Sequence, residues 1–218
     1  IETPTFEYFE VFSKEVGTIP SRELYKFFDR EGNTLVLRPD FTPSVSRACA
    51  TYFNPEKEVV SLCYTGNTFI NNSSFRGRLK ETTQMGVERM GDDSPEADAE
   101  ILAMTVECLL ATGLTEFQVS VGQVDYYKAI FAQTGLSQEE EEELRELISQ
   151  KNYFGVEELV KNKNMDKSLA RVLSQLPQMF GSTEVLEKAK SLTDNPQALK
   201  AVARLEEIYE LLKVYGYE

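Results

Sequence analysis

Gln84-Met85-Gly86-Val87-Glu88 is the stretch that decides the fold prediction, and it lies within a longer extended segment, 79–90. Successive side chains of a strand point to opposite faces, so Gln84, Gly86 and Glu88 share one face. An amide and a carboxylate with only a glycine between them predict an open polar trough on that face. We refer to the face of this strand that carries these three residues as the polar trough.

The residues before this stretch predict further antiparallel strands. The loop 71–78 is polar and contains a glycine, so the segments on its two sides are expected to form a long hairpin. Upstream, the polar turn Arg30-Glu31-Gly32-Asn33 separates two strand-like segments and predicts a second hairpin. The strand-like segments before the loop are 24–29, 34–38, 58–64 and 68–70.

Two helices are predicted by their start signals. Thr42 followed by Pro43 offers an N-cap and a first helical residue, and an apolar pattern continues to Tyr52. Ser94-Pro95-Glu96 combines a cap, a proline and an acid in the first turn, and the helix it begins is expected to run to Gly113. Strands that alternate with helices in this way favour the α+β class.

The second half of the chain is expected to be helical after one more strand. Apolar and polar residues alternate over 117–121, which predicts a half-buried strand, and 125–133 is expected to be a helix. From 137 onward helix formers and charged residues dominate, and four breakers cut the segment into short helices: Gly155, Pro177, Gly181 and Pro196. We expect a core over 1–136, an all-helical insertion over 137–213, and over 214–218 the truncated start of a return to the core.

Composition removes several classes of function. The 218 residues carry a formal net charge of -13 and no histidine, so binding of nucleic acid or anionic lipid is disfavoured and the commonest general base is missing. Cys49, Cys63 and Cys108 lack the spacing of a metal or redox motif and are expected to be buried thiols. No segment is long and apolar enough to span a membrane, so the cytoplasm and no membrane partner are expected. We also expect this chain to be a fragment of a longer protein.

Polar residues at the ends of the predicted strands form a candidate binding site for a small zwitterion. Asp40, Thr42 and Glu88 offer acceptors for an amino group, Gln84 lies on the same strand face as Glu88, and Arg78 is expected near the carboxylate. The alternative is that these are surface residues with ordinary cross-strand pairs. Composition alone does not separate the two.

The same residues resemble a known family. Arg38-Pro39-Asp40-Phe41-Thr42 is similar to the Arg-Pro-Glu-x-Thr of histidyl-tRNA synthetases, and Gln84-Met85-Gly86-Val87-Glu88 to their Gln-x-Gly-x-Glu. The resemblance implies a class II synthetase-like antiparallel sheet flanked by helices, in which these segments hold histidine. The stretch 1–7 resembles motif 1 of class II synthetases, whose proline, here Pro4, lies at the dimer interface. The resemblance extends from 1 to about 135.

One motif departs from the synthetase pattern. Synthetases carry Phe-Arg-x-Glu in motif 2, where the arginine grips the α-phosphate of ATP, and this chain has Phe69-Ile70-Asn71-Asn72. An isoleucine supplies no charge-assisted phosphate contact, and losing such a contact costs on the order of several kcal/mol of transition-state stabilisation. Amino-acid activation is therefore expected to be lost.

Further motifs make the chain similar to the regulatory subunits of ATP phosphoribosyltransferase, which are synthetase paralogues. The segments are Leu37–Thr42, Cys63–Asn67 and Ser94–Glu100. The resemblance implies no chemistry, cofactor or metal of its own. It implies assembly with itself as a dimer and with the short catalytic subunit, and feedback inhibition by histidine. Residues that face the imidazole come, in that family, from a later segment that this chain does not contain.

Other interpretations remain beside this one. The chain is alternatively a fragment of a histidyl-tRNA synthetase, or a synthetase-like sensor or scaffold with another partner, such as a tRNA-binding regulator of a kinase. Arg76, Arg78 and Lys80 would then mark an RNA contact, rather than a partner or anion contact. Asp92-Asp93 resembles the acidic pair of a phosphoribosyltransferase, but no phosphate loop rich in glycine and threonine follows it, and acids in the turn before the Ser94 cap explain it better. The acidic run 139–143 is either a contact surface or the solvated first turn of a helix.

Overall fold

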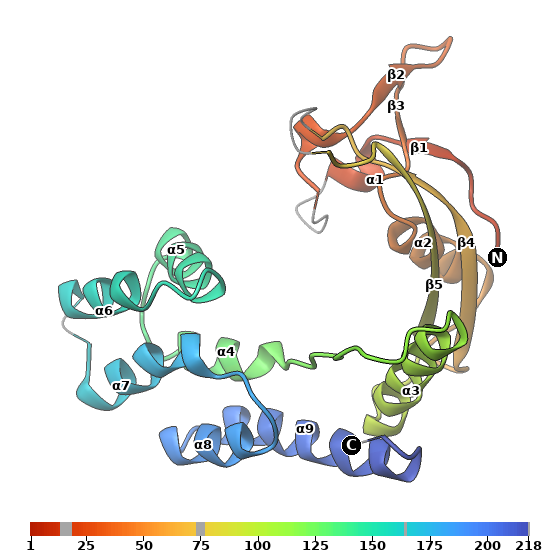
Figure 1. Cartoon of the computed structure of the whole chain (residues 1–218). Coiled ribbons are helices and arrows are strands. Elements are labelled where there is room, and N and C mark those ends of the chain that lie inside the picture. The colour runs from red at the N-terminus through yellow and green to blue at the C-terminus, as the bar shows by residue number, and fades with distance from the viewer. Residues whose placement is uncertain (14–18, 73–76, 164, 218) are drawn as a thin grey trace. The chain divides into compact units, whose positions relative to one another are not determined.

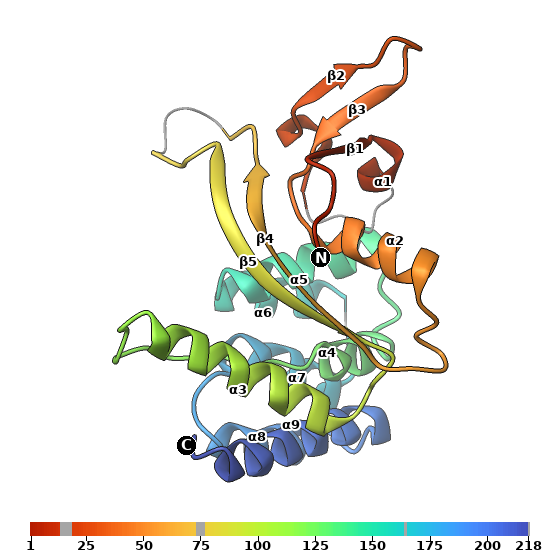
Figure 2. The ribbon, with the colours of Figure 1, turned by 90° about the vertical axis from the view of Figure 1, so that its right-hand side faces the viewer.

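The computed structural model describes residues 1–13, 19–72, 77–163 and 165–217, and the chain forms two compact units. The first unit, 1–93, contains the strands, and the second, 94–218, contains helices (Figures 1 and 2). The strands and the helices of both units agree with the predicted α+β class. The predicted boundary after 136 does not coincide with the division between the units, and the division into core and insertion stays a prediction.

The first unit begins with a small antiparallel sheet. Its strands are β1 (Phe6–Tyr8), β2 (Lys26–Phe28) and β3 (Thr34–Leu37), in the order β1-β3-β2. The β2–β3 pair is the first predicted hairpin, with Phe28 opposite Thr34. Val36 is fully buried and packs with Phe12 of the short helix α1 (Glu10–Ser13) and with Leu24, which follows the 3-10 helix η1 (Ser21–Glu23). This small core supports β3, which pairs with the N-terminal strand β1 and leads directly into Arg38 and Asp40 of the candidate site.

A long curved hairpin forms the rest of the strand structure (Figure 2). It pairs β4 (Val60–Phe69) with β5 (Glu81–Met90), so the two extended pieces predicted before the loop form one continuous strand. Tyr64 lies opposite Gly86, and Gly66 opposite Gln84. Because directly paired residues of an antiparallel hairpin point to the same face, Tyr64 and Gly66 belong to the face of the polar trough.

Helix α2 (Thr42–Tyr52) packs on this hairpin through Val45, which lies in one apolar cluster with Phe41 and Tyr64. The predicted N-cap role of Thr42 is wrong. Thr42 is the first helical residue, and its backbone N–H donates to Asp40 Oδ1 at 3.2 Å, so Asp40 satisfies this helix end. The hydroxyl of Thr42 is thereby left for another partner.

The second unit is built from helices around one core. They are α3 (Pro95–Ala111), α4 (Val124–Phe131), α5 (Gln138–Ser149), α6 (Tyr153–Asn162), α7 (Lys167–Gln175), the 3-10 helix η3 (Leu176–Gln178), α8 (Glu184–Leu192) and α9 (Pro196–Val214). Ile130, Leu144 and Leu173 are fully buried in this core. Arg204 of α9 donates to Asp98 of α3 at 2.7 Å, which ties the two long helices together. None of the described helices combines the length and apolar character needed to cross a bilayer.

The helix caps of this unit follow the sequence signals. The Ser94 hydroxyl accepts from the N–H of Ala97 at 3.2 Å, and Ser137 forms a reciprocal capping box with Glu140. Acids of the run 139–143 lie in the first turn of α5, where they suit the helix dipole. Gly155 was predicted to separate two helices, but it lies within the first turn of α6. Its N–H donates to Asn152 Oδ1 at 3.0 Å.

Two further expectations are wrong. The segment 117–121 forms no strand, and within the described residues no other chain segment pairs with its backbone. Cys63 and Cys108 are exposed, whereas Cys49 is buried as expected. Cys63 is exposed because it lies on the opposite face of β4 from the buried Tyr64. At the C-terminal end, α9 continues through Val214, and the return to the core over 214–218 stays a prediction.

Candidate functional site

The polar trough meets the start of α2 through a direct hydrogen bond. Thr42 Oγ1 donates to Glu88 Oε1 at 2.6 Å, which joins the first residue of α2 to β5. Asp40 lies in the turn that precedes the helix, and Thr42 also donates to it through the backbone. Three of the five predicted histidine-binding residues are thus brought together from segments more than forty positions apart.

Tyr64 occupies the space that Gly86 leaves, so the trough is not the open groove that the sequence suggested. A Cβ built on Gly86 would lie 2.3 Å from the Tyr64 hydroxyl oxygen. Gln84 Nε2 donates to the same hydroxyl at 3.4 Å, which adds the fourth predicted residue to the group. We call Asp40, Thr42, Tyr64, Gln84 and Glu88 the polar cluster.

The surroundings of Tyr64 keep its hydroxyl neutral. Burial is the main cause that raises the pKa of Tyr64, and the negative charges of Glu88 and Asp40 raise it further, against the opposing hydrogen bonds of Gln84 and Thr42. A neutral phenol both donates and accepts hydrogen bonds. The cluster therefore presents two carboxylates, a phenol and an amide, which suits a cationic amino group.

An aromatic and cationic stack supports the cluster. The rings of Phe41 and Tyr64 are parallel, with centroids 4.4 Å apart, and Arg38 Cζ lies 4.1 Å from the centroid of Phe41. Gly66 gives room to this stack, because a Cβ there would lie 2.9 Å from Phe41 Cζ. Tyr64 was not among the predicted site residues, and Arg38 was predicted only as part of the motif Arg38–Thr42. Gly66 of β4 and Gly86 of β5 were a signal that large side chains lie over them.

Two predicted site residues lie outside the cluster. Arg78 is exposed, and within the described part of the chain it makes no hydrogen bond or ion pair with the other four candidates. Arg76, a candidate for RNA contact, lies outside the described residues. Pro4 is exposed, and its carbonyl oxygen accepts a hydrogen bond from Arg38 Nη1 at 3.2 Å.

The segment that corresponds to motif 2 continues the hairpin. The backbone N–H of Ile70 donates to Lys80 O at 2.9 Å, and Asn72 Nδ2 donates to Leu79 O at 2.9 Å. Neither Ile70 nor Asn72 carries a charge, and the amide of Asn72 already donates to Leu79, in the segment that leads into β5. Nothing at these two positions offers a guanidinium to a phosphate.

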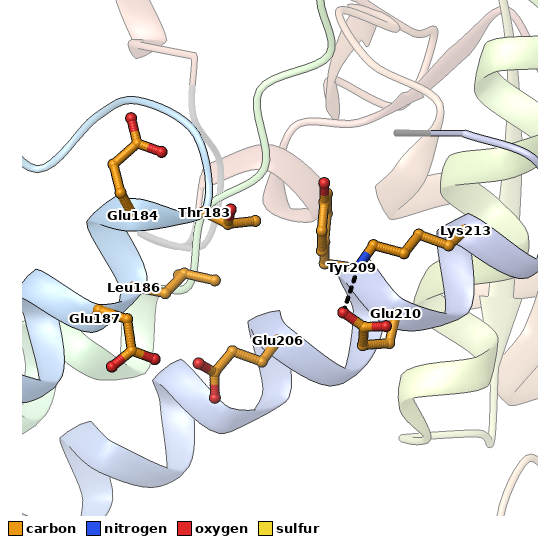
Figure 3. Close-up of a pocket in the computed structure, with 8 residues that line it drawn as sticks. All are labelled: Thr183, Glu184, Leu186, Glu187, Glu206, Tyr209, Glu210 and Lys213. Atoms are coloured by element: carbon orange, nitrogen blue, oxygen red, sulfur yellow. Dashed lines mark hydrogen bonds and ion pairs between the residues drawn. The ribbon is translucent and has the colours of Figure 1, made fainter.

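A second hollow, between α8 and α9, is lined by acidic residues (Figure 3). Glu187 and Glu206 both pair with Lys190, and Lys213 pairs with Glu210 at 2.6 Å. These carboxylates therefore have their counterions within the protein.

Among the described residues no group of histidine, cysteine or acidic side chains is arranged to hold a metal ion. Asp92, of the acidic pair in the sequence, accepts from Arg89 at 2.8 Å.

Sequence comparisons point to one family. The family model described as histidyl-tRNA synthetase matches residues 1–217. The ATP phosphoribosyltransferase regulatory subunit of Acetivibrio thermocellus is 41% identical over 216 residues, which are 99% of this chain and 52% of that protein. The corresponding subunit of Clostridium acetobutylicum is 37% identical and is covered to 54%, with 100% of this chain matched. This chain spans about half the length of the curated relatives that it matches.

Structural comparisons agree. A crystal structure described as an ATP phosphoribosyltransferase regulatory subunit/histidyl-tRNA synthetase from Bacillus halodurans is similar with a TM-score of 0.86 and 34% identity, over 99% of this chain and 56% of that one. The histidyl-tRNA synthetase from Nostoc sp. PCC 7120 has a TM-score of 0.73 at 18% identity, over 100% of this chain and 51% of that one. The latter likeness shows the fold alone, which is the class II synthetase type predicted from the motifs.

Proposed function

The chain belongs to the histidyl-tRNA synthetase family, and from this premise we propose that it is part of a non-catalytic regulatory subunit of ATP phosphoribosyltransferase. The observation that carries the proposal is the contrast between two halves of one site. The polar cluster is assembled by the bond between Thr42 and Glu88, whereas Ile70 and Asn72 replace the charged nucleotide-binding residues of motif 2. Such a site binds an amino acid and has no grip on the phosphates of ATP.

The relatives support the choice of assembly. Proteins 35 to 41% identical to this chain share the name ATP phosphoribosyltransferase regulatory subunit. We propose that this protein likewise joins a short catalytic subunit in the cytoplasm, makes it active, and passes on feedback inhibition by histidine. For such inhibition, histidine must bind the inhibited state of the complex more tightly than the active state.

Histidine is the proposed ligand of the polar cluster. Its amino group would lie among Asp40, Thr42 and Glu88, with Gln84 beside it, because these residues supply the acceptors and the negative charge. Arg78 was expected near the carboxylate. Among the described residues it makes no hydrogen bond or ion pair with the cluster, so we look for another group at that end of the ligand.

Self-association through the N-terminal strand is the second part of the proposal. Pro4 is exposed, and Phe6 and Tyr8 of β1 are about half exposed on one face of the small sheet, beside Phe27. Phe27 is partly exposed on β2, which is separated from β1 by β3. Aromatic residues exposed together on one face of a sheet are typical of a surface that another protein covers. Pro4 therefore stays our candidate for the dimer interface.

Exchange of pyrophosphate into ATP tests the loss of activation. The full-length protein is expected to show no histidine-dependent exchange above background, because motif 2 lacks its phosphate ligand. A histidyl-tRNA synthetase from the same cell provides the positive control. Robust exchange by the full-length protein would instead identify a synthetase.

Co-purification tests the partner. The full-length protein is expected to form a stable complex with a short phosphoribosyltransferase chain, and histidine is expected to inhibit that complex. Binding of tRNA at physiological salt, without such a complex, would favour the sensor or scaffold interpretation.

A further inference from the structure

Arg38 is a buried cation that makes no ion pair with any described residue. The residue is 7% exposed. Its Nε donates to Asn67 O at 2.8 Å, and its Nη1 donates to Thr3 O at 2.8 Å and to Pro4 O. Burial lowers the pKa of Arg38, and the charge of Glu2 opposes that shift. A buried charge whose hydrogen bonds go only to neutral carbonyl groups gains from an anion that reaches it.

The third nitrogen of this guanidinium has no acceptor within the described part of the chain. Nη2 takes part in none of the hydrogen bonds of Arg38, yet it is not one of the unpartnered polar atoms that are sealed from solvent. It therefore keeps access to solvent. A Cβ built on Gly66 would lie 2.7 Å from it, which places Nη2 directly above Gly66. Gly66 pairs with Gln84, so Nη2 lies on the face of the polar cluster.

The groups on this face are ordered by charge. The acids Glu88 and Asp40 and the hydroxyl of Thr42 lie at one end, the Tyr64 hydroxyl and the Gln84 amide follow, and the guanidinium lies beyond them. An amino acid carries a positive amino group and a negative carboxylate on one carbon atom. The order of charges on the face matches that head group.

We propose that Arg38, through Nη2 and beside the Gln84 amide, binds the carboxylate of the amino acid whose amino group lies at the acidic end of the polar cluster. Arg38 then has the role that the sequence suggested for Arg78. The inference rests on the proposed function, since it assumes that an amino acid occupies the cluster. It adds a selectivity: ligands that lack the carboxylate, such as an amino alcohol, are rejected because the buried cation would stay uncompensated.

Calorimetry of the full-length protein with its catalytic partner tests this, with histidine and histidinol as the two probes. Wild type is expected to bind histidine at least about tenfold more tightly than histidinol. Arg38→Gln is expected to remove that preference, because it lowers the affinity for histidine and leaves the affinity for histidinol unchanged. Arg78→Gln replaces an exposed arginine and is the control, and it is expected to leave both affinities unchanged.

The possible outcomes are distinct. Equal affinity of wild type for the two ligands overturns the inference, as does loss of the preference in Arg78→Gln but not in Arg38→Gln. An equal loss of both affinities in a folded Arg38→Gln also overturns it, because a purely structural arginine would behave in that way. If Arg38→Gln does not fold, the wild-type preference and its persistence in Arg78→Gln decide. Absence of binding of either ligand to wild type rejects the proposed function and this inference with it.

Discussion

Thr42 connects a helix terminus to a strand through one hydroxyl, and this single contact assembles the acidic end of the candidate site. The hydroxyl is not engaged in capping its own helix, because Asp40 satisfies the backbone there. It donates instead to Glu88. The carboxylate is thereby oriented by a neutral donor and keeps its second oxygen for a ligand.

Replacement of Thr42 by valine tests this contact. Thr42→Val keeps the branched shape but removes the donor, and we expect histidine affinity of the full-length protein to fall by about tenfold. Thr51→Val is the matched control, since Thr51 is an exposed residue of the same helix whose hydroxyl donates to Arg47 O at 2.7 Å. Calorimetry would contradict the role of Thr42 if both variants bound histidine like wild type.

Gly86 is required because Tyr64 lies over it. Gly86→Ala would place a Cβ 2.4 Å from Tyr64 Cζ, so the ring must move off Phe41, and we expect a loss of about 1–3 kcal/mol in the free energy of unfolding. Gly122→Ala is the control, because nothing lies within 4 Å of a Cβ built there. Urea unfolding measures both.

A double variant separates the causes. With Tyr64→Leu present, Gly86→Ala is expected to cost less than it does alone, because the clash is with the phenol ring. If the loss of unfolding free energy in the double variant equals the sum of the losses in the two single variants, Gly86 is needed for another reason.

At the scale of single residues, the sequence predicted which polar residues come together better than it predicted the shape that they form. Four of the five candidates, Asp40, Thr42, Gln84 and Glu88, lie in one group, because strand alternation and motif order are local properties. Which large side chain fills the space above Gly86 depends on the register of β4 and β5. A sequence does not reveal that register until the loop and both strand ends are known.

At the scale of elements, the cap signals of α3 and α5 were reliable, whereas the one predicted at Thr42 was not. Ser137 illustrates this, since its hydroxyl accepts from the N–H of Glu140 while the Glu140 carboxylate accepts from the N–H of Ser137 at 2.9 Å. Both partners are three residues apart, so the contact is encoded locally.

Removal of this cap is expected to weaken the second unit. Ser137→Ala should lower the free energy of unfolding by about 1 kcal/mol, because the first turn of α5 loses an acceptor. Ser149→Ala, at the last residue of the same helix, removes only a bond to Glu146 O and serves as the control. Thermal unfolding followed by circular dichroism compares the two, and equal midpoints would contradict a capping role.

The segment 117–121 shows where local signals fail. Its residues alternate as in a strand, yet a strand exists only when a neighbour pairs with its backbone, and within the described residues none does. Phe117, Val119 and Val121 instead line an apolar hollow of about 610 Å³ between α3 and α9. Gln118 lines the same hollow, so alternation predicted neither a strand nor two separate faces, because pairing is a property of the whole fold.

At the scale of the whole molecule, the proposed regulation obeys reciprocity. If histidine changes the affinity of the catalytic subunit by some factor, the subunit must change the affinity for histidine by the same factor. We expect that factor to be about 5–150-fold, the usual range for such coupling.

Two calorimetric titrations measure it. One determines histidine affinity with and without the catalytic subunit, and the other determines subunit affinity with and without histidine. Thr42→Val is expected to weaken the binding of histidine both with and without the catalytic subunit. A ratio of one in both titrations would mean that histidine acts at some site other than this complex.

The three nitrogens of Arg38 face different parts of the protein. Nη1 holds the Thr3 and Pro4 carbonyls, Nε holds the Asn67 carbonyl, and Nη2 lies over Gly66. Since a guanidinium is flat and stiff, it cannot tilt at one corner and stay still at the others. A ligand that displaces Nη2 would therefore also move Nη1 and the backbone of Thr3 and Pro4 that it holds. Because Pro4 is the candidate for the dimer interface, a bound small molecule would act on a neighbouring subunit through this one side chain.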